Sequence, residues 1–75
     1  MKKRLYNCII IHYLNRERND YDALKYRKVT NVPKLITWVV NKGYDVSAVN
    51  VYDSFSRKFI RQVRSMEEAR YYFNQ

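Results

Sequence analysis

A local pattern that occurs twice, 34 residues apart, limits this chain to a small set of folds. "VTNV" at 29–32 and "VRSM" at 63–66 each combine a strand end, a polar residue suited to cap a helix and an apolar first helical residue. The apolar positions that follow stay in step, because Val39 falls opposite Phe73. The sequence therefore predicts two β-hairpin–helix units, one after the other.

The first helix is predicted over "NVPKLITWVVNKG" (31–43). Asn31 or Thr30 is suited to cap its N-terminus, Pro33 is tolerated in the first turn, and Gly43 is suited to end it. Its apolar residues recur at helical spacing, which is typical of a helix packed on a core. This stripe consists of Val32, Leu35, Ile36, Val39 and Val40.

The segment "SRKFIRQVRSMEEARYYF" (56–73) allows two interpretations. One continuous helix would carry its arginines opposite an apolar stripe, as in a helix that enters a nucleic-acid groove. A strand over 58–64 followed by a helix over 65–74 instead uses an S-x-x-E capping box. In that box the Ser65 hydroxyl accepts from the Glu68 N–H, and the Glu68 carboxylate reaches back to the Ser65 N–H. We favour the strand and helix, because Ser has only middling propensity inside a helix.

Three further segments are rich in β-branched and aromatic residues and predict strands. They are "LYNCIIIHYL" (5–14), "ALKYRKVT" (23–30) and "YDVSAVNVYD" (44–53), with a polar loop over 15–22 and a turn over 53–57. This order predicts an α+β fold, ββαββα, in which a four-stranded antiparallel sheet carries both helices on one face. The whole chain, 1–75, is expected to form one small domain whose two ββα units span about 1–43 and 44–75.

Net charge points to an acidic partner. Fifteen Lys and Arg against seven Asp and Glu give +8 and a pI near 9.8, which fits a nucleic-acid-binding protein. Residues 1–31 carry eight basic and three acidic groups, and residues 54–64 carry four basic groups and no acid. The charge therefore belongs mainly to the predicted strands and their loops, and the predicted helices are close to neutral.

Catalytic and metal-binding patterns are weak. Cys8 and His12 are the only thiol and imidazole, but four strand residues put their Cα atoms ~13 Å apart. A nucleophile and its base need hydrogen-bond reach, ~3 Å. Glu17, Asp20 and Asp22 share a predicted loop and could hold a hard cation, although arginines stand beside them. We expect no enzymatic activity, no metal site and no cofactor, with a small metal-dependent nuclease as the enzymatic alternative.

Basic and aromatic residues are the remaining signal, since sheet faces rich in Tyr and Arg bind nucleic acid by base stacking and phosphate neutralisation. We expect a non-enzymatic module that contacts nucleic acid or a nucleoprotein complex through a Lys/Arg/Tyr sheet surface. Which sheet face is basic stays open, because neither alternating set of the strand over 58–64 is cleanly apolar. The candidate binding residues are Arg4, Tyr6, Arg16, Arg18, Lys25, Tyr26, Arg27, Lys28, Arg57, Lys58, Arg61 and Arg64.

The first strand predicts a homodimer. Ile9 and Ile11 point to one face, and Cys8 and Ile10 point to the other. A strand that is apolar on both faces is expected to be covered on both, whereas one helical layer covers only one. The other face would then meet a partner, most simply a second copy of the chain.

A protein partner is the alternative function, for example that of a small phage or mobile-element protein that inhibits a host enzyme or defence complex. Small size, weak catalytic patterns and a bias towards Tyr, Asn, Lys and Ile motivate this hypothesis. The single Cys cannot form an intramolecular disulfide, which favours a reducing cytoplasm. No segment approaches the ~20 apolar residues needed to span a bilayer, so no membrane association is expected.

Overall fold

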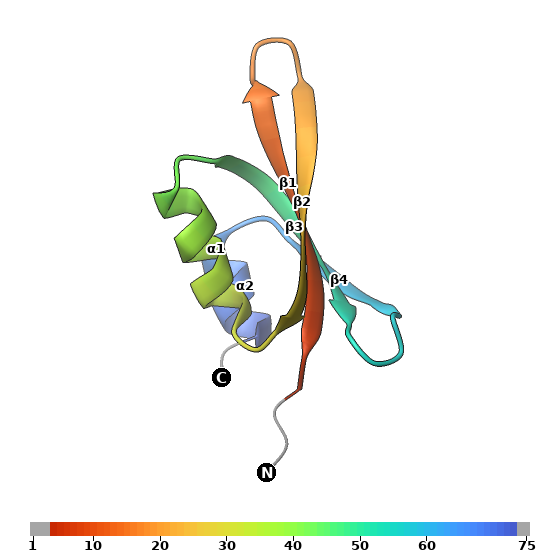
Figure 1. The fold of residues 1–75 in the computed structure, drawn as a ribbon. Coiled ribbons are helices and arrows are strands. Elements are labelled where there is room, and N and C mark those ends of the chain that lie inside the picture. The colour runs from red at the N-terminus through yellow and green to blue at the C-terminus, as the bar shows by residue number, and fades with distance from the viewer. Residues whose placement is uncertain (1–3, 74–75) are drawn as a thin grey trace.

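The computed structural model describes residues 4–73 and has the element order ββαββα (Figure 1). Its four strands form one antiparallel sheet in the order β2-β1-β3-β4. The predicted α+β fold is therefore confirmed. The elements are β1 (Tyr6–Asn15), β2 (Asp20–Val29), α1 (Val32–Asn41), β3 (Asp45–Asp53), β4 (Phe59–Val63) and α2 (Met66–Phe73).

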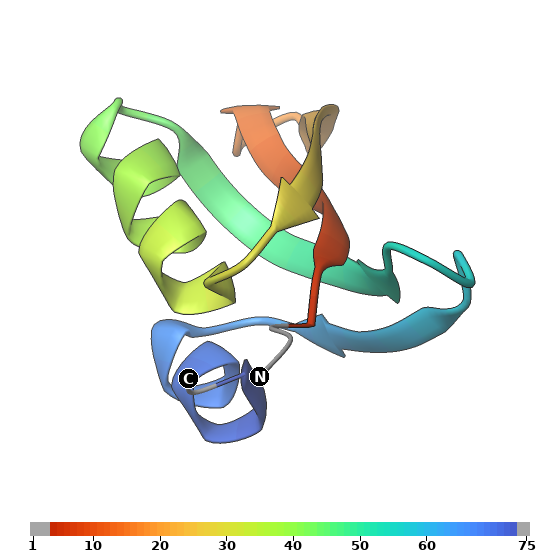
Figure 2. The same ribbon diagram turned by 60° about the horizontal axis from the view of Figure 1, so that its bottom comes forward.

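Each hairpin supplies one central strand and one edge strand of the sheet. β1 and β3 pair in the middle, and β2 and β4 form the two edges. α1 carries the chain from the edge strand β2 to the central strand β3, and α2 follows β4. Both helices lie on the same face of the twisted sheet (Figure 2). The opposite face carries no helix and is called the open face below.

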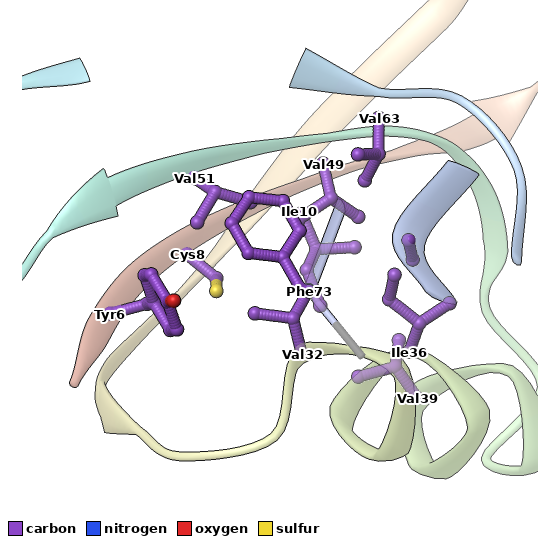
Figure 3. Packing of buried hydrophobic residues seen from close by; sticks show 11 residues of the cluster. Tyr6, Cys8, Ile10, Val32, Ile36, Val39, Val49, Val51, Val63 and Phe73 are labelled. Carbon is purple, nitrogen blue, oxygen red and sulfur yellow. The ribbon is translucent and has the colours of Figure 1, made fainter. Parts of the chain in front are cut away.

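The hydrophobic core lies between the helices and the sheet (Figure 3). On β1 the burial alternates with a period of two: even-numbered residues from Tyr6 to His12 are buried, and the odd-numbered ones between them are half-buried. This alternation follows from the pleat, which turns successive side chains to opposite faces. The core cluster consists of Tyr6, Cys8, Ile10, Val32, Ile36, Val39, Val49, Val51, Val63, Ala69 and Phe73.

The helix ends follow the predicted capping chemistry. The Lys34 N–H donates to the Asn31 side chain at 3.0 Å, and the Glu68 N–H donates to the Ser65 hydroxyl at 3.1 Å. Gly43 has φ of +100°, and the flanking N–H groups bond back to the last turn of α1, as in a Schellman motif. One detail of the predicted capping box is wrong, because the Glu68 carboxylate accepts from the Arg64 N–H at 3.0 Å.

The first hairpin is longer than the sequence predicts. β2 begins at Asp20, within the predicted loop over 15–22, because Tyr13 pairs with Tyr21 and Asn15 with Asp20. Asp has low strand propensity, so this extension arises from pairing with β1. The hairpin projects beyond the rest of the sheet (Figure 1).

The predicted apolar stripe of α1 is correct at three positions. Val32, Ile36 and Val39 are buried, and Leu35 packs at the margin of the core. Val40 is 48% exposed, and it lines a hollow between α1 and the start of α2. Neither helix in the described residues is long and apolar enough to cross a membrane.

Candidate functional site

The open face is a mixed polar and apolar surface that the sheet register defines. Ile9 lies beside Lys25 on β2 and Asn50 on β3, and Asn50 lies beside Gln62 on β4. The Gln62 side-chain amide N–H donates to the Asn50 side-chain oxygen Oδ1 at 2.8 Å. Cross-strand partners share a face, so this row of four residues crosses the whole open face, with Ile9 half-buried within it.

A hollow of about 390 Å³ opens on this face where β1, β2 and the β3–β4 turn meet. Four exposed cations line it, namely Lys25, Arg27, Lys28 and Arg57, and we call this site the basic hollow. Its floor includes Asn7 and Ile9 of β1, and Tyr52 of β3 forms part of its wall. The site therefore combines positive charge, amide hydrogen-bonding groups and one aromatic ring.

A β-bulge places Arg27 and Lys28 together at the hollow. Tyr6 pairs with Val29 and Cys8 pairs with Tyr26, so Asn7 alone faces two residues of β2. Lys28 has φ of 56°, and its N–H donates to the Asn7 side chain at 3.4 Å. Bulges bend a strand and redirect its side chains, and here the bulge brings two adjacent cations to one site.

The β3–β4 turn places the fourth cation. The Asp53 carboxylate accepts from the N–H groups of Phe55 and Ser56 at 2.7 and 3.0 Å. The Arg57 N–H donates to the Asp53 carbonyl at 2.8 Å, and Arg57 has φ of 64°. The backbone N–H of Ser56, that of Phe55 and the Arg4 guanidinium all lower the pKa of Asp53. The turn is thus held by an ionised carboxylate.

No ion pair among residues 4–73 joins a cation of the basic hollow to a carboxylate. Among residues 4–73, ion pairs join Arg4 to Asp53 at 3.0 Å and Arg16 to Asp45 at 2.7 Å. The Arg16 guanidinium lowers the pKa of the Asp45 carboxyl through that contact. Neither pair includes a cation of the hollow, so the hollow remains a concentrated positive site.

Two aromatic pairs stand at opposite ends of the open face. Tyr52 and Phe59 have ring centroids 5.4 Å apart beside the basic hollow, and Phe59 is 56% exposed. At the hairpin end, the Tyr13 and Tyr21 centroids are 4.6 Å apart. The Tyr21 hydroxyl donates to the Tyr13 hydroxyl at 3.4 Å, which lowers the pKa of Tyr13 and raises that of Tyr21.

The structure brings five of the twelve predicted binding residues together in the lining of the hollow and separates the others. The five are Lys25, Tyr26, Arg27, Lys28 and Arg57. Arg4 and Arg16 are exposed and form the two ion pairs. Arg18 lies in the β1–β2 turn, Lys58 follows Arg57, and Arg64 follows β4, all exposed. None of these five cations lines the hollow.

Three predicted residues lie on the helix side of the sheet. Tyr6 is buried, with its ring centroid 5.1 Å from that of Phe73. Tyr26 packs edge-on against Trp38 of α1. The Arg61 guanidinium lies 3.5 Å from the ring centroid of Tyr72 on α2. The pleat turns these three side chains towards the helices. Tyr6 and Arg61 therefore lie outside the basic hollow, and Tyr26 belongs to its lining although its ring packs on α1.

Register also changes which residues make up the site. Strict alternation groups Phe59 with Arg61 and Val63, but an irregularity between Val51 and Tyr52 shifts the pairing so that Phe59 lies beside Tyr52. Phe59 thus joins the open face, whereas Val63 is buried. Asn7, Tyr13, Tyr21, Asn50, Tyr52 and Gln62 were also outside the predicted site. Only the cross-strand register, which a single sequence does not give, assigns them to it.

Within the part of the chain that the structure describes, the catalytic and metal candidates do not gather into one site, although Cys8 forms part of the lining of the basic hollow. Cys8 and His12 both lie on β1 facing the helices and are buried, and burial raises the pKa of the Cys8 thiol to about 12. The imidazole of His12 packs edge-on against Tyr44. Among residues 4–73, no three His, Cys, Asp or Glu side chains gather closely enough to hold a metal ion.

A second hollow, of about 290 Å³, lies on the helix side between α1 and the start of α2. Its lining is mainly apolar and includes Ile36, Val40, Val46 and Met66. It contains one cation, Arg64, so its chemistry differs from that of the basic hollow.

No model of a protein family, curated protein sequence or solved structure matches this chain.

Proposed function

We propose that the chain binds nucleic acid through its open face, with phosphate groups held in the basic hollow. The observation that carries this proposal is the convergence of Lys25, Arg27, Lys28 and Arg57 on one concave site. Its lining contains no carboxylate, and none of the four cations forms an ion pair among residues 4–73. Phosphate contacts from Lys and Arg release condensed counterions, and this term supplies most of non-specific nucleic-acid affinity. A hollow that gathers several such contacts is suited to a polyanion.

Backbone geometry supports the same proposal. Among residues 4–73, the non-glycine residues with positive φ are Asn19, Lys28 and Arg57. Asn is common in this conformation, whereas Lys and Arg are not. Both uncommon cases line the basic hollow. Uncommon backbone conformations cluster at functional sites, which supports a role for these two cations in binding a negatively charged ligand.

The test measures the binding of labelled single- and double-stranded DNA and RNA by fluorescence anisotropy at two salt concentrations. The hollow variant combines Lys25→Gln and Arg27→Gln. Its matched control combines Lys34→Gln and Arg70→Gln, which remove the same charge from exposed positions of the two helices. We expect the affinity of the wild type to fall as the salt concentration rises. The hollow variant should bind more weakly, and its slope of log K against log salt concentration should be smaller in magnitude by about two.

Two results would contradict the proposal. Absence of binding at low salt would remove it altogether, because phosphate contacts are strongest there. Equal losses in the hollow variant and the helix variant would show that net charge acts without the hollow. An acidic protein surface is the alternative partner, and a stoichiometric partner retained from a bacterial lysate after nuclease treatment would favour it.

A further inference from the structure

The open face offers more than phosphate contacts, because exposed aromatic rings stand at both of its ends. Tyr52 and Phe59 flank the basic hollow, and Tyr13 and Tyr21 lie on the projecting hairpin. Phe59 and Tyr21 are 56% and 48% exposed. Aromatic rings on a sheet surface bind bases by stacking, and this contact tolerates any base because every base has a π-face.

The sheet register gives the separation of the two aromatic pairs. Tyr52 lies beside Asn7, and Tyr21 lies beside Tyr13, on the same strand β1. Six strand residues at ~3.3 Å each separate the pairs by about 20 Å. A nucleic-acid strand advances 3.4 Å per nucleotide when stacked as in a duplex, so about six nucleotides span this distance.

Polar groups fill the interval between the rings. Lys25 stands at the edge of the face, and the Asn50–Gln62 amide pair crosses it on the neighbouring strands. The Asn50 amide N–H groups and the Gln62 carbonyl oxygen take no part in the hydrogen bond that joins the pair. Amides of this kind can donate to and accept from the edges of unpaired bases.

Duplex nucleic acid cannot use these rings. Its bases are stacked on one another and paired, so their π-faces are hidden. Readout of the major groove of DNA by an inserted helix would have to use α1 or α2, and both lie on the opposite face of the sheet (Figure 2). A duplex could therefore contact the cations of the hollow and leave the aromatic pairs unoccupied.

We propose that the preferred ligand of the open face is a single strand of about six nucleotides or fewer, stacked at one end on Tyr52 and Phe59 and at the other on Tyr21. The Arg16 guanidinium lies over the neighbouring Tyr13 ring, 4.5 Å from its centroid, so Tyr21 offers the more accessible ring of that pair. This inference rests on the proposed function and specifies its ligand. Lys25 and the other cations of the basic hollow hold the phosphates between and beside the stacked bases.

The experiment compares oligothymidylates and oligouridylates of about two to about twelve nucleotides with a hairpin duplex of similar phosphate number. We expect affinity for single strands to rise steeply up to about six nucleotides and slowly beyond. Tyr52→Leu and Tyr21→Leu should each weaken single-strand binding by about 5- to 150-fold, which corresponds to the loss of one stacked base. Binding of the duplex should change by less than about twofold, since it needs no stacked base.

The matched control is Tyr71→Leu, which removes an 80% exposed ring from α2 on the other side of the molecule and should leave binding unchanged. Shifts of the Tyr13, Tyr21, Tyr52 and Phe59 ring signals in NMR spectra of the wild type, on addition of oligothymidylate, test the inference without any variant. Equal affinity for single strands and duplex, with no effect of either tyrosine variant, would overturn it and leave the proposed function standing. Absence of binding to both at low salt would overturn both.

Discussion

At the scale of single residues, Lys28 and Arg57 are the most informative positions in the molecule. Both hold a left-handed backbone conformation, with φ of 56° and 64°, which costs an L-residue roughly 1–2 kcal/mol. Gly would adopt the same conformation without that cost. Two cations at these positions therefore lower stability, and their side chains both reach the basic hollow.

Replacing either cation by Gly should separate stability from binding. Lys28→Gly and Arg57→Gly relieve the strain of ~1–2 kcal/mol and add about 0.5–1 kcal/mol of entropy to the unfolded state. We expect each variant to unfold with a free energy higher by up to about 1 kcal/mol, measured by chemical denaturation, and to bind oligonucleotide more weakly.

Asn19→Gly is the control for this prediction, because Asn19 has φ of 54° but lies in the β1–β2 turn, outside the hollow. Its affinity for oligonucleotide should equal that of the wild type. Unchanged binding in both cation variants would show that the strained backbone at the hollow serves another purpose.

At the scale of elements, the sequence predicts what local chemistry decides. Asn31, Gly43 and Ser65 mark helix ends because capping depends on groups within a few residues. The start of β2 was not predictable in this way, since Asp20 and Tyr21 become strand only by pairing with β1. The face that Phe59 occupies was not predictable for a related reason, because an irregularity in pairing with β3 overrides the strict alternation that would group it with Arg61 and Val63.

The candidate site was predictable in its charge but not in its shape. The clustering of basic residues along the chain identified Lys25, Arg27, Lys28 and Arg57 as candidate binding residues, and all four line the hollow. The sequence could not separate them from Arg61, which stacks on Tyr72 behind the sheet. Only the register decides which face a strand residue occupies, and a shift of one position exchanges the two faces.

The central strand β1 gives a direct test of this division of faces. Ile10 is fully buried towards the helices, whereas its neighbour Ile11 is half-buried on the open face. Ile10→Ala should lower the free energy of unfolding by ~2–5 kcal/mol, because it leaves a cavity in the core. Ile11→Ala should cost clearly less, since solvent reaches its site. Similar losses in thermal or chemical denaturation would mean that both faces are covered.

At the scale of the whole molecule, the charge is distributed unequally between two sides. The helices carry few net charges, while the open face holds the basic hollow. Ile9 and Ile11 lie half-buried on that same face, so the predicted homodimer through this face stays a prediction. Such a dimer would cover the hollow, and it would therefore compete with nucleic acid for one surface.

Self-association should respond to salt in the opposite direction to nucleic-acid binding. Each copy carries +8, and pairing two open faces would bring their unpaired cations together. We expect any dimer to be favoured by about 500 mM salt over about 50 mM salt, because screening weakens the repulsion, and to dissociate on addition of oligonucleotide. Sedimentation velocity measures both effects. A dimer that responds to neither would have its interface elsewhere, for example along an edge strand.

The sheet order β2-β1-β3-β4 has a consequence for how the chain folds. The two central strands come from different ββα units, so the seam between the units runs through the middle of the sheet. Until β3 pairs with β1, the first unit holds a strand with one unpaired edge and a helix stripe only partly covered. Neither ββα unit completes the sheet by itself. The chain therefore reaches its stable fold only when β1 and β3, which are distant in sequence, have paired.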